Sequence, residues 1–194
     1  LIDREWPAKY ADKINLKVLL LGTIKITENT YRSIRYLCAD KPEDVSRKLE
    51  FAVSIPPLAR TILDSVFTIV YLFDDLDGRL AWYHKSGWRE ISEEHERYQR
   101  QYGDDPSWVE YIGWQKAFID HGQQDLGITD EEAIDLKKIK WWPNPGKMAR
   151  DTSMSEDRRR YLSYLNDWFY KTLSADSHLS WPGFASRASH CCVF

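Results

Sequence analysis

Three polar side chains near the end of the chain recur at a spacing that could bring them together. Tyr170, Ser174 and His178 follow one another at intervals of four, and residues four apart lie on one face of a helix. A phenol, a hydroxyl and an imidazole on one face can bind an anion or transfer a proton. This face is therefore a candidate ligand-binding site, with His178 as the candidate acid–base group.

A charged pair interrupts the most apolar stretch of the sequence. Arg60 and Asp64 lie in "PLARTILDSVFTIVYLF", whose apolar residues would cover nearly the whole circumference of a central, buried helix. A buried guanidinium has five donors, which one aspartate cannot satisfy. We expect Tyr170, Ser174 and His178 to approach the pair. The cluster is then either a structural network or a ligand site, and the sequence leaves both open.

Two other kinds of active site find no support in the residues. Ser174 and His178 with Asp176 lack the Gly-x-Ser-x-Gly turn of a nucleophile triad, and on a helix Asp176 would point away from the other two. No histidine has a glutamate three positions before it or another histidine four away, as metal-binding helices require. "SEEHE" at 92–96 is typical of a solvated helix face. We expect no metal and no cofactor.

A basic segment with tryptophans is the candidate for nucleic-acid binding. From Lys137 to Arg160 the chain has eight basic and three acidic residues, although its net charge is −3. Interleaved cations and aromatic rings suit the phosphates and bases of a single strand. The candidates are Lys140, Trp141, Trp142, Lys147 and Arg150. The alternative is a charged loop that its tryptophans pin to the core, and Arg158–Arg160 could equally contact Asp74 and Asp75.

Apolar residues recur at helical spacing along the chain, and strand patterns hardly appear. The first predicted helix covers residues 11–38. A second begins at residues 40–43 and must end by residue 55, because the residue before a proline disfavours helical backbone. Pro56 and Pro57 open the third helix, which continues to Phe73.

The second half of the chain contains further helix signals. A charged segment occupies residues 77–102. Asp105-Pro106 begins a fifth helix that ends at Gly127. The apolar residues assigned to it are Trp108, Ile112, Ala117 and Phe118. A capping box at 129–132 starts a short helix that ends near Ile139, and "KWWPNPGKMARDT" is predicted to be a loop.

The last helices complete the predicted architecture. Ser153 and Glu156 cap a helix that runs towards His178, and another begins at Pro182. The sequence predicts a single all-α bundle of six to eight helices in one domain, 1–194. Its core helices occupy about 11–75 and 153–194, and a charged helical insertion occupies about 77–147.

Composition narrows the class of protein. An apolar content of 43% and a charged content of 29% are typical of a soluble globule. The longest nearly unbroken apolar stretch, 66–73, is far shorter than the ~20 residues of a membrane span. Three cysteines without a disulfide framework favour a cytoplasmic setting. The chain begins with Leu and ends in Cys-Cys-Val-Phe, so we expect a fragment or a trimmed chain. Its nine tryptophans and apolar end favour a homodimer.

Two segments resemble a known group of proteins. "PLARTILDSVFTIVYLF", followed near the end by "YKTLSADSHLS", is similar to a family of uncharacterised bacterial helical proteins that share a domain of unknown function. The shared features are an Arg-x-x-x-acid helix after a proline-marked turn and a late Ser-x-x-x-His. They fall on Arg60, Asp64, Ser174 and His178. The resemblance implies an all-helical fold and no particular activity.

A more distant resemblance is to HEPN-type helical bundles, many of which are ribonucleases of toxin and anti-phage systems. Their Arg-x(4–6)-His pattern occurs at Arg79…His84 and Arg89…His95, although not late in the bundle, where that family keeps it. A site could still form if Arg60 held a phosphate beside His178. The sequence therefore predicts a binding or interaction module, in a defence or stress system, with a metal-independent ribonuclease as the alternative. Whether the protein is an enzyme stays open.

Overall fold

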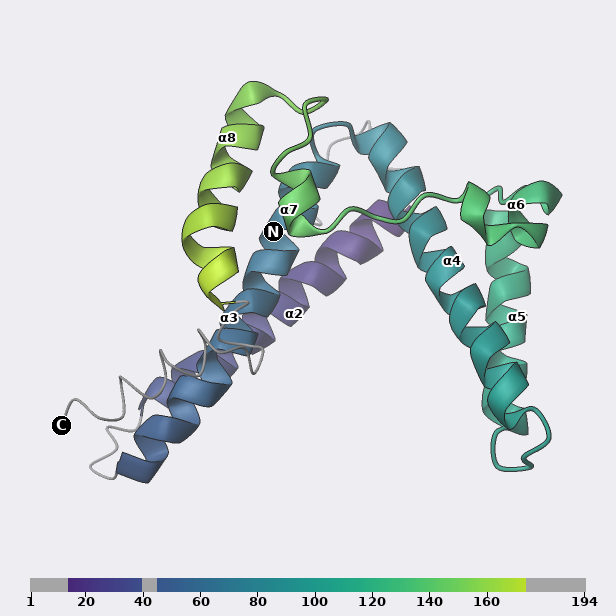
Figure 1. The fold of residues 1–194 in the computed structure, drawn as a ribbon, viewed down its shortest axis with the longest axis horizontal. Coiled ribbons are helices and arrows are strands. Elements are labelled where there is room, and N and C mark those ends of the chain that lie inside the picture. The colour runs from purple at the N-terminus through teal and green to yellow at the C-terminus, as the bar shows by residue number, and fades with distance from the viewer. Residues whose placement is uncertain (1–13, 40–44, 174–194) are drawn as a thin grey trace. The chain divides into compact units, whose positions relative to one another are not determined.

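The described part of the protein is largely helical. The computed structural model describes residues 14–39 and 45–173, which form helices and short connections without a strand (Figure 1). The prediction of an all-α bundle of six to eight helices is confirmed. The chain divides into two compact units, one made of residues up to Asp74 together with those from Pro145 onward, the other of Asp75–Asn144.

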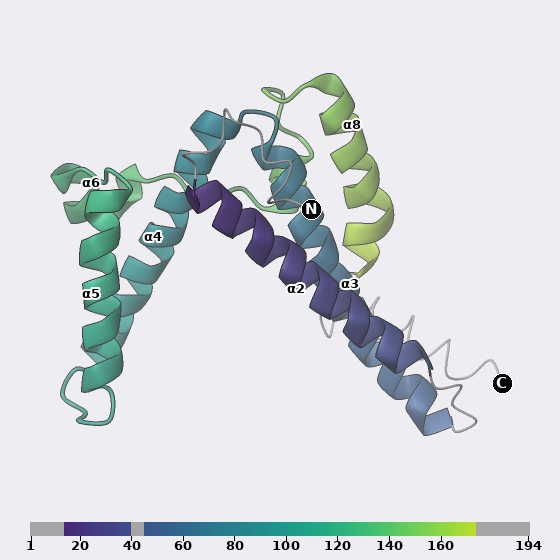
Figure 2. The ribbon, with the colours of Figure 1, turned by 180° about the vertical axis from the view of Figure 1, so that it is seen from behind.

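Two long helices dominate the first unit. Helices α2 (Ile14–Ala39) and α3 (Val45–Leu72) run antiparallel, side by side, in both views of the ribbon (Figures 1 and 2). The shorter α7 (Pro145–Met148) and α8 (Glu156–Leu165) pack against α3. A π-helical turn, η3 (Asn166–Tyr170), continues α8 towards Leu173. The buried apolar residues of this unit are Leu16, Leu20, Phe67, Tyr71, Leu72, Met148, Ala149, Met154 and Leu162.

The predicted helix break before Pro56 is wrong. Pro56 and Pro57 lie inside α3, which continues through them. A proline in a helix interior removes a backbone hydrogen bond and costs ~3 kcal/mol. Helix α3 packs along α2 and against α7 and α8, and these contacts offset that cost. The predicted helix start at residues 40–43 lies outside the described residues, as does the one at Pro182.

The apolar segment of α3 is less enclosed than the sequence predicts. Among residues 54–72, the buried ones are Phe67, Tyr71 and Leu72. Ser54–Leu72, with a mean hydropathy of 1.3, is also long and apolar enough to cross a membrane, although the core helix of a soluble protein can pass the same test. Arg60 and Asp64 interrupt the apolar run within this stretch without lowering its mean hydropathy below that of a candidate span.

Asp74 organises the start of α8. Its Oδ1 accepts hydrogen bonds from the backbone N–H and the hydroxyl of Ser155, at 3.1 and 2.8 Å. Ser155 occupies the N-cap position without a side-chain hydrogen bond to the helix backbone. The predicted cap by Ser153 is wrong, because the Ser153 hydroxyl donates to Asp151. Arg158 forms an ion pair with Asp74 at 3.1 Å, which confirms the predicted contact between the arginine run and this acidic stretch.

The second unit is a helical hairpin with a short cap. Helices α4 (Leu76–Tyr102) and α5 (Val109–Asp125) pack together, and α6 (Asp130–Ile134) and the 3-10 turn η2 (Leu136–Lys138) follow (Figure 1). The predicted capping box is confirmed: the Thr129 hydroxyl accepts from the backbone N–H of Glu132, whose carboxylate accepts from that of Thr129. The buried apolar cluster is Trp88, Ile119, Ile128 and Ile139.

Two smaller predictions in this region need correction. The loop predicted around Pro145 contains the short helix α7. The 92–96 segment of α4 is not a wholly solvated face, because Ser92 is buried and its hydroxyl donates to the carbonyl of Trp88 at 2.9 Å. The Glu93 carboxylate forms an ion pair with Arg89 of the same helix, at 2.8 Å.

Candidate functional sites

Helix α3 and the turn η3 bring three of the predicted site residues together. The Arg60 Nη2 donates to the Tyr170 hydroxyl at 3.1 Å, and the Arg60 Nε lies 3.9 Å from the Asp64 Oδ2. Tyr170 also packs edge-on against Phe67, with 5.6 Å between ring centroids. Ser174 and His178 lie outside the described residues. The structure thus assembles Arg60, Asp64 and Tyr170 as the sequence predicts.

The cluster is half-buried. The side chains of Arg60 and Asp64 are 27% and 46% exposed, so neither is sealed in a core. Burial raises the pKa of Asp64, against the opposing effects of the Tyr170 hydrogen bond and the Arg60 charge. Burial also raises the pKa of the Tyr170 phenol. The tyrosine hydroxyl therefore stays protonated at neutral pH, and its oxygen accepts the hydrogen bond from Arg60.

This arrangement favours a structural role for the cluster. The arginine, the phenol and the carboxylate bind one another, as in side-chain networks that fix how two helices pack. Tyr170 is the last residue of the π-helical turn η3. A π-turn adds one residue to a helical turn and so re-aims the side chains that follow it. The described contacts thus join the α8–η3 segment to the middle of α3.

The raised pKa of Asp64 predicts a specific pH dependence. Because the folded-state pKa lies above the unfolded value, the stability associated with Asp64 falls as pH rises from about 4 through the folded pKa. Asparagine does not titrate. Urea unfolding of Asp64→Asn from pH 3 to 7 should therefore show its stability, relative to the wild type, rising with pH.

Asp167→Asn is the matched control for this experiment. Asp167 is exposed, and hydrogen bonds from Lys171 and Asn166 lower its pKa. Its contribution to stability is therefore complete above the unfolded pKa and is lost as pH falls through the folded pKa, so the stability of Asp167→Asn relative to the wild type should fall with rising pH. The same sign of pH dependence in both variants would contradict the assignment.

The nucleic-acid candidates divide between the two units. Lys140, Trp141 and Trp142 belong to the second unit, whereas Lys147 and Arg150 belong to the first. No single surface is therefore defined by all five residues together. Their environments also differ, which distinguishes the two adjacent tryptophans.

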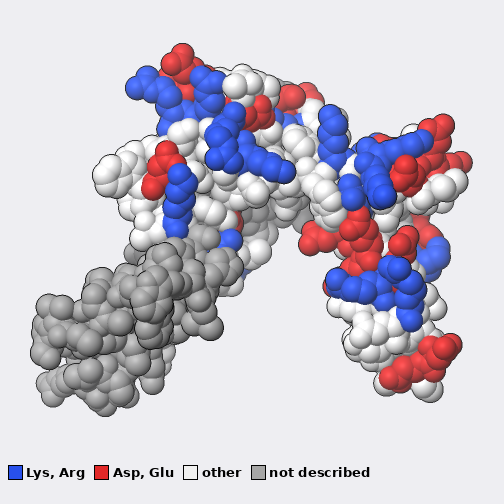
Figure 3. Space-filling view, in the orientation of Figure 1, with Lys and Arg blue, Asp and Glu red and all other residues white. Residues whose placement is uncertain are grey.

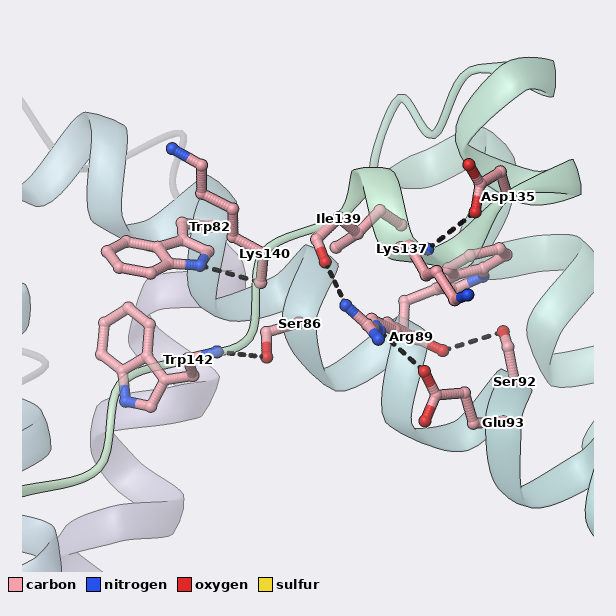
Figure 4. Close-up of polar contacts among 11 residues, drawn as sticks. Trp82, Ser86, Arg89, Ser92, Glu93, Asp135, Lys137, Ile139, Lys140 and Trp142 are labelled. Carbon is pink, nitrogen blue, oxygen red and sulfur yellow. Dashed lines mark hydrogen bonds and ion pairs between the residues drawn. The ribbon is translucent and has the colours of Figure 1, made fainter.

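Trp142 is a packing residue. Its ring meets Trp82 and Tyr83 edge-on, with centroids 5.4 and 5.0 Å apart. Its backbone N–H donates to the Ser86 hydroxyl at 2.7 Å (Figure 4). Trp141 is 45% exposed, and the guanidinium of Arg89 lies 4.3 Å from its ring centroid. Trp142 therefore anchors the loop by packing, as the alternative prediction expected, whereas the Trp141 ring is exposed at the surface.

Neither Arg-x(4–6)-His pair is arranged to act together. Both pairs lie on the continuous helix α4. Separations of five and six residues place side chains roughly 140° and 120° apart around a helix axis. Arg79 is buried, and Arg89 donates to the carbonyl of Ile139 at 2.6 Å and to Glu93 at 2.8 Å. These contacts give Arg89 a structural role.

An exposed row of aromatic rings on α5 is a surface that the sequence did not single out. Tyr111, Trp114 and Phe118 stack along the helix, with centroids 6.2 and 5.9 Å apart and interplanar angles of 28° and 29°. All three are exposed, Trp114 to 61%. Ala117 and Phe118, which the sequence assigned to the apolar side of the helix, therefore lie outside the core. The buried residues of α5 are Ile112, Gln115 and Ile119.

Comparison of the chain with protein-family models, with curated proteins and with solved structures finds no match. Among residues 14–39 and 45–173, no group of three histidine, cysteine or acidic residues is arranged to hold a metal ion. The resemblances noted from the sequence stay predictions, and the geometry of the two units carries the functional argument.

Proposed function

We propose that this protein is an interaction module that self-associates through the exposed face of α5. One observation carries the proposal, the exposed row of Tyr111, Trp114 and Phe118, which lies beside the buried stripe of the same helix. Contiguous exposed apolar patches mark interaction sites, and tryptophan and tyrosine are the residues most enriched among the anchors of protein interfaces.

The aromatic row is self-complementary, which favours a second copy of the chain as the partner. In an antiparallel pair of α5 helices with a twofold axis near residue 115, Tyr111 of each copy would face Phe118 of the other. Trp114 would lie beside Trp114 of the second copy at the centre. Such an isologous interface needs only one surface, used twice.

The residues that flank the row fit the same axis. Glu110 would lie opposite His121 of the second copy, so that an imidazole N–H can donate to a carboxylate. This charge pair fits the register set by the aromatic row.

The proposal assigns the Arg60, Asp64 and Tyr170 cluster to the internal architecture of the first unit. It retains a bacterial, cytoplasmic setting in a defence or stress system, which rests on the sequence resemblance and the cysteine usage. Sedimentation equilibrium of the wild type tests the proposal. A single helix face buries less area than a standard interface, so we expect a monomer–dimer equilibrium in the micromolar range.

A HEPN-like ribonuclease is the alternative function. The observation that favours it is the Arg60–Tyr170 hydrogen bond, which ties α3 to the turn that precedes Ser174 and His178 along the chain. The interaction-module account predicts that a mixed RNA substrate at low salt stays intact with the wild type and with His178→Ala. Cleavage by the wild type that is lost in a His178→Ala variant of unchanged melting temperature would establish the ribonuclease instead.

A further inference from the structure

The segment that carries Trp141 is held against α4 by its backbone. The Arg89 guanidinium donates to the carbonyl of Ile139 at 2.6 Å, and the Trp82 indole N–H donates to the carbonyl of Lys140 at 2.9 Å (Figure 4). The backbone N–H of Trp142 donates to Ser86 at 2.7 Å. These bonds fix the chain on both sides of Trp141. Its ring therefore emerges from a defined position.

The Trp141 ring is also oriented by a fixed cation. The Arg89 guanidinium lies 4.3 Å from the ring centroid, and its own side chain is only 11% exposed. Glu93 and the Ile139 carbonyl hold the guanidinium in place. A cation at this distance binds the face of an indole. The exposed part of the ring is thus presented to solvent by a rigid support, and little side-chain entropy is lost when a flat ligand stacks on it.

Three lysines lie within four residues of Trp141 in the sequence. Lys137, Lys138 and Lys140 are all exposed. Lys138 pairs with Glu131 at 2.8 Å, a contact between two exposed side chains that a phosphate can replace. Figure 3 shows basic side chains gathered beside acidic ones over the α6 end of this unit. A strongly acidic peptide or protein would find the same lysines, but it would not use the flat ring.

We propose that Trp141 is a stacking platform for a base of single-stranded nucleic acid, and that Lys137, Lys138 and Lys140 contact the adjoining phosphates. The inference goes beyond the proposed function and does not depend on association through α5. Aromatic rings flanked by cations bind single strands with little sequence preference, because every base has a π face. RNA and DNA share this chemistry.

The test is fluorescence anisotropy with labelled oligouridine and oligothymidine strands of about twelve nucleotides, a length within the range that one single-strand binding domain covers. The wild type should bind at 50 mM salt, and three phosphate contacts should weaken binding about 18-fold at 200 mM. Trp141→Ala should weaken binding roughly 5- to 150-fold, the range for one stacked base, whereas Trp141→Phe should keep most of the affinity. The two strands distinguish an RNA ligand from a DNA ligand.

Trp168→Ala is the matched control, because Trp168 is 70% exposed and belongs to η3 of the other unit. Its affinity for the oligonucleotides should equal that of the wild type. The proposal is overturned if the wild type does not bind either strand, or if Trp141→Ala binds as the wild type does. It is also overturned if Trp168→Ala weakens binding equally. A Trp114→Glu variant that binds as the wild type would show that the site and the α5 association are separate.

Discussion

Replacing Trp114 by glutamate is expected to leave the protein monomeric at concentrations where the wild type is a dimer. Trp114 is 61% exposed on the single chain and stands at the centre of the aromatic row. An anchor residue of this type contributes about 2 kcal/mol or more to an interface. The twofold axis uses it twice, so the loss of about 4 kcal/mol weakens association roughly a thousandfold. Size-exclusion chromatography with light scattering measures the change in mass.

The matched control is Trp168→Glu, the same substitution at another exposed tryptophan. Trp168 is not on α5, so this variant should keep the dimerisation constant of the wild type. Because neither position is buried, both variants should retain the circular dichroism of the wild type. Loss of the dimer in both variants would mean that α5 is not the interface. A wild type that stays monomeric at all soluble concentrations would contradict the proposed self-association itself.

The second large effect is expected in the core of the helical hairpin. Trp88 is 4% exposed, packs with Ile119, Ile128 and Ile139, and donates its indole N–H to the Ile119 carbonyl at 2.9 Å. Trp88→Ala would leave a cavity and a buried carbonyl without its donor. Such substitutions cost about 3–5 kcal/mol, which lowers the melting temperature by about 10–15 °C in a chain of this length.

Two variants separate the parts of this effect in calorimetry. Trp88→Phe keeps most of the ring volume and loses the indole N–H, so it should cost about 1–3 kcal/mol. Trp141→Ala truncates an exposed tryptophan of the same unit and should melt within a few degrees of the wild type. If Trp88→Ala melts like Trp141→Ala, Trp88 does not support the hairpin core as described.

Local sequence signals predicted local structure well. The capping box at Thr129 and Glu132 joins residues three apart, so the sequence contains all of it. The helix break at Pro56 was predicted wrongly, because the local cost of a proline is offset by packing against α2, α7 and α8. Those contacts come from residues distant in sequence, and no local pattern shows them.

The polar cluster could be anticipated because a physical requirement links distant residues. An apolar helix that contains Arg60 needs polar partners for the guanidinium, and Tyr170, Ser174 and His178 recur at one-face spacing on a later predicted helix. Tyr170 is one of these partners, because its hydroxyl accepts a hydrogen bond from Arg60. The π-helical turn that ends at Tyr170 has no glycine or proline to mark it.

Which side of α5 is buried was not predictable from hydrophobicity. The helix buries the polar Gln115 and exposes the aromatic Trp114 and Phe118. An amphipathic pattern predicts the reverse for these three residues, with the rings buried and the glutamine exposed. Trp141 and Trp142 present the same difficulty, because two adjacent identical residues have different roles. Contacts with Ser86 and Arg89 of α4 decide which of the two rings is exposed.

The register of the α5 pair can be tested by mixing two variants. Glu110→Lys and His121→Glu should each associate severalfold more weakly than the wild type. In the first variant a lysine faces His121, and in the second a glutamate faces Glu110, and the twofold axis repeats each mismatch. In a mixed dimer, the new lysine faces the new glutamate, and the wild-type Glu110 faces the wild-type His121. Sedimentation equilibrium of the equimolar mixture should therefore show tighter association than either variant alone. A mixture that associates no better than its components would contradict antiparallel self-association through α5.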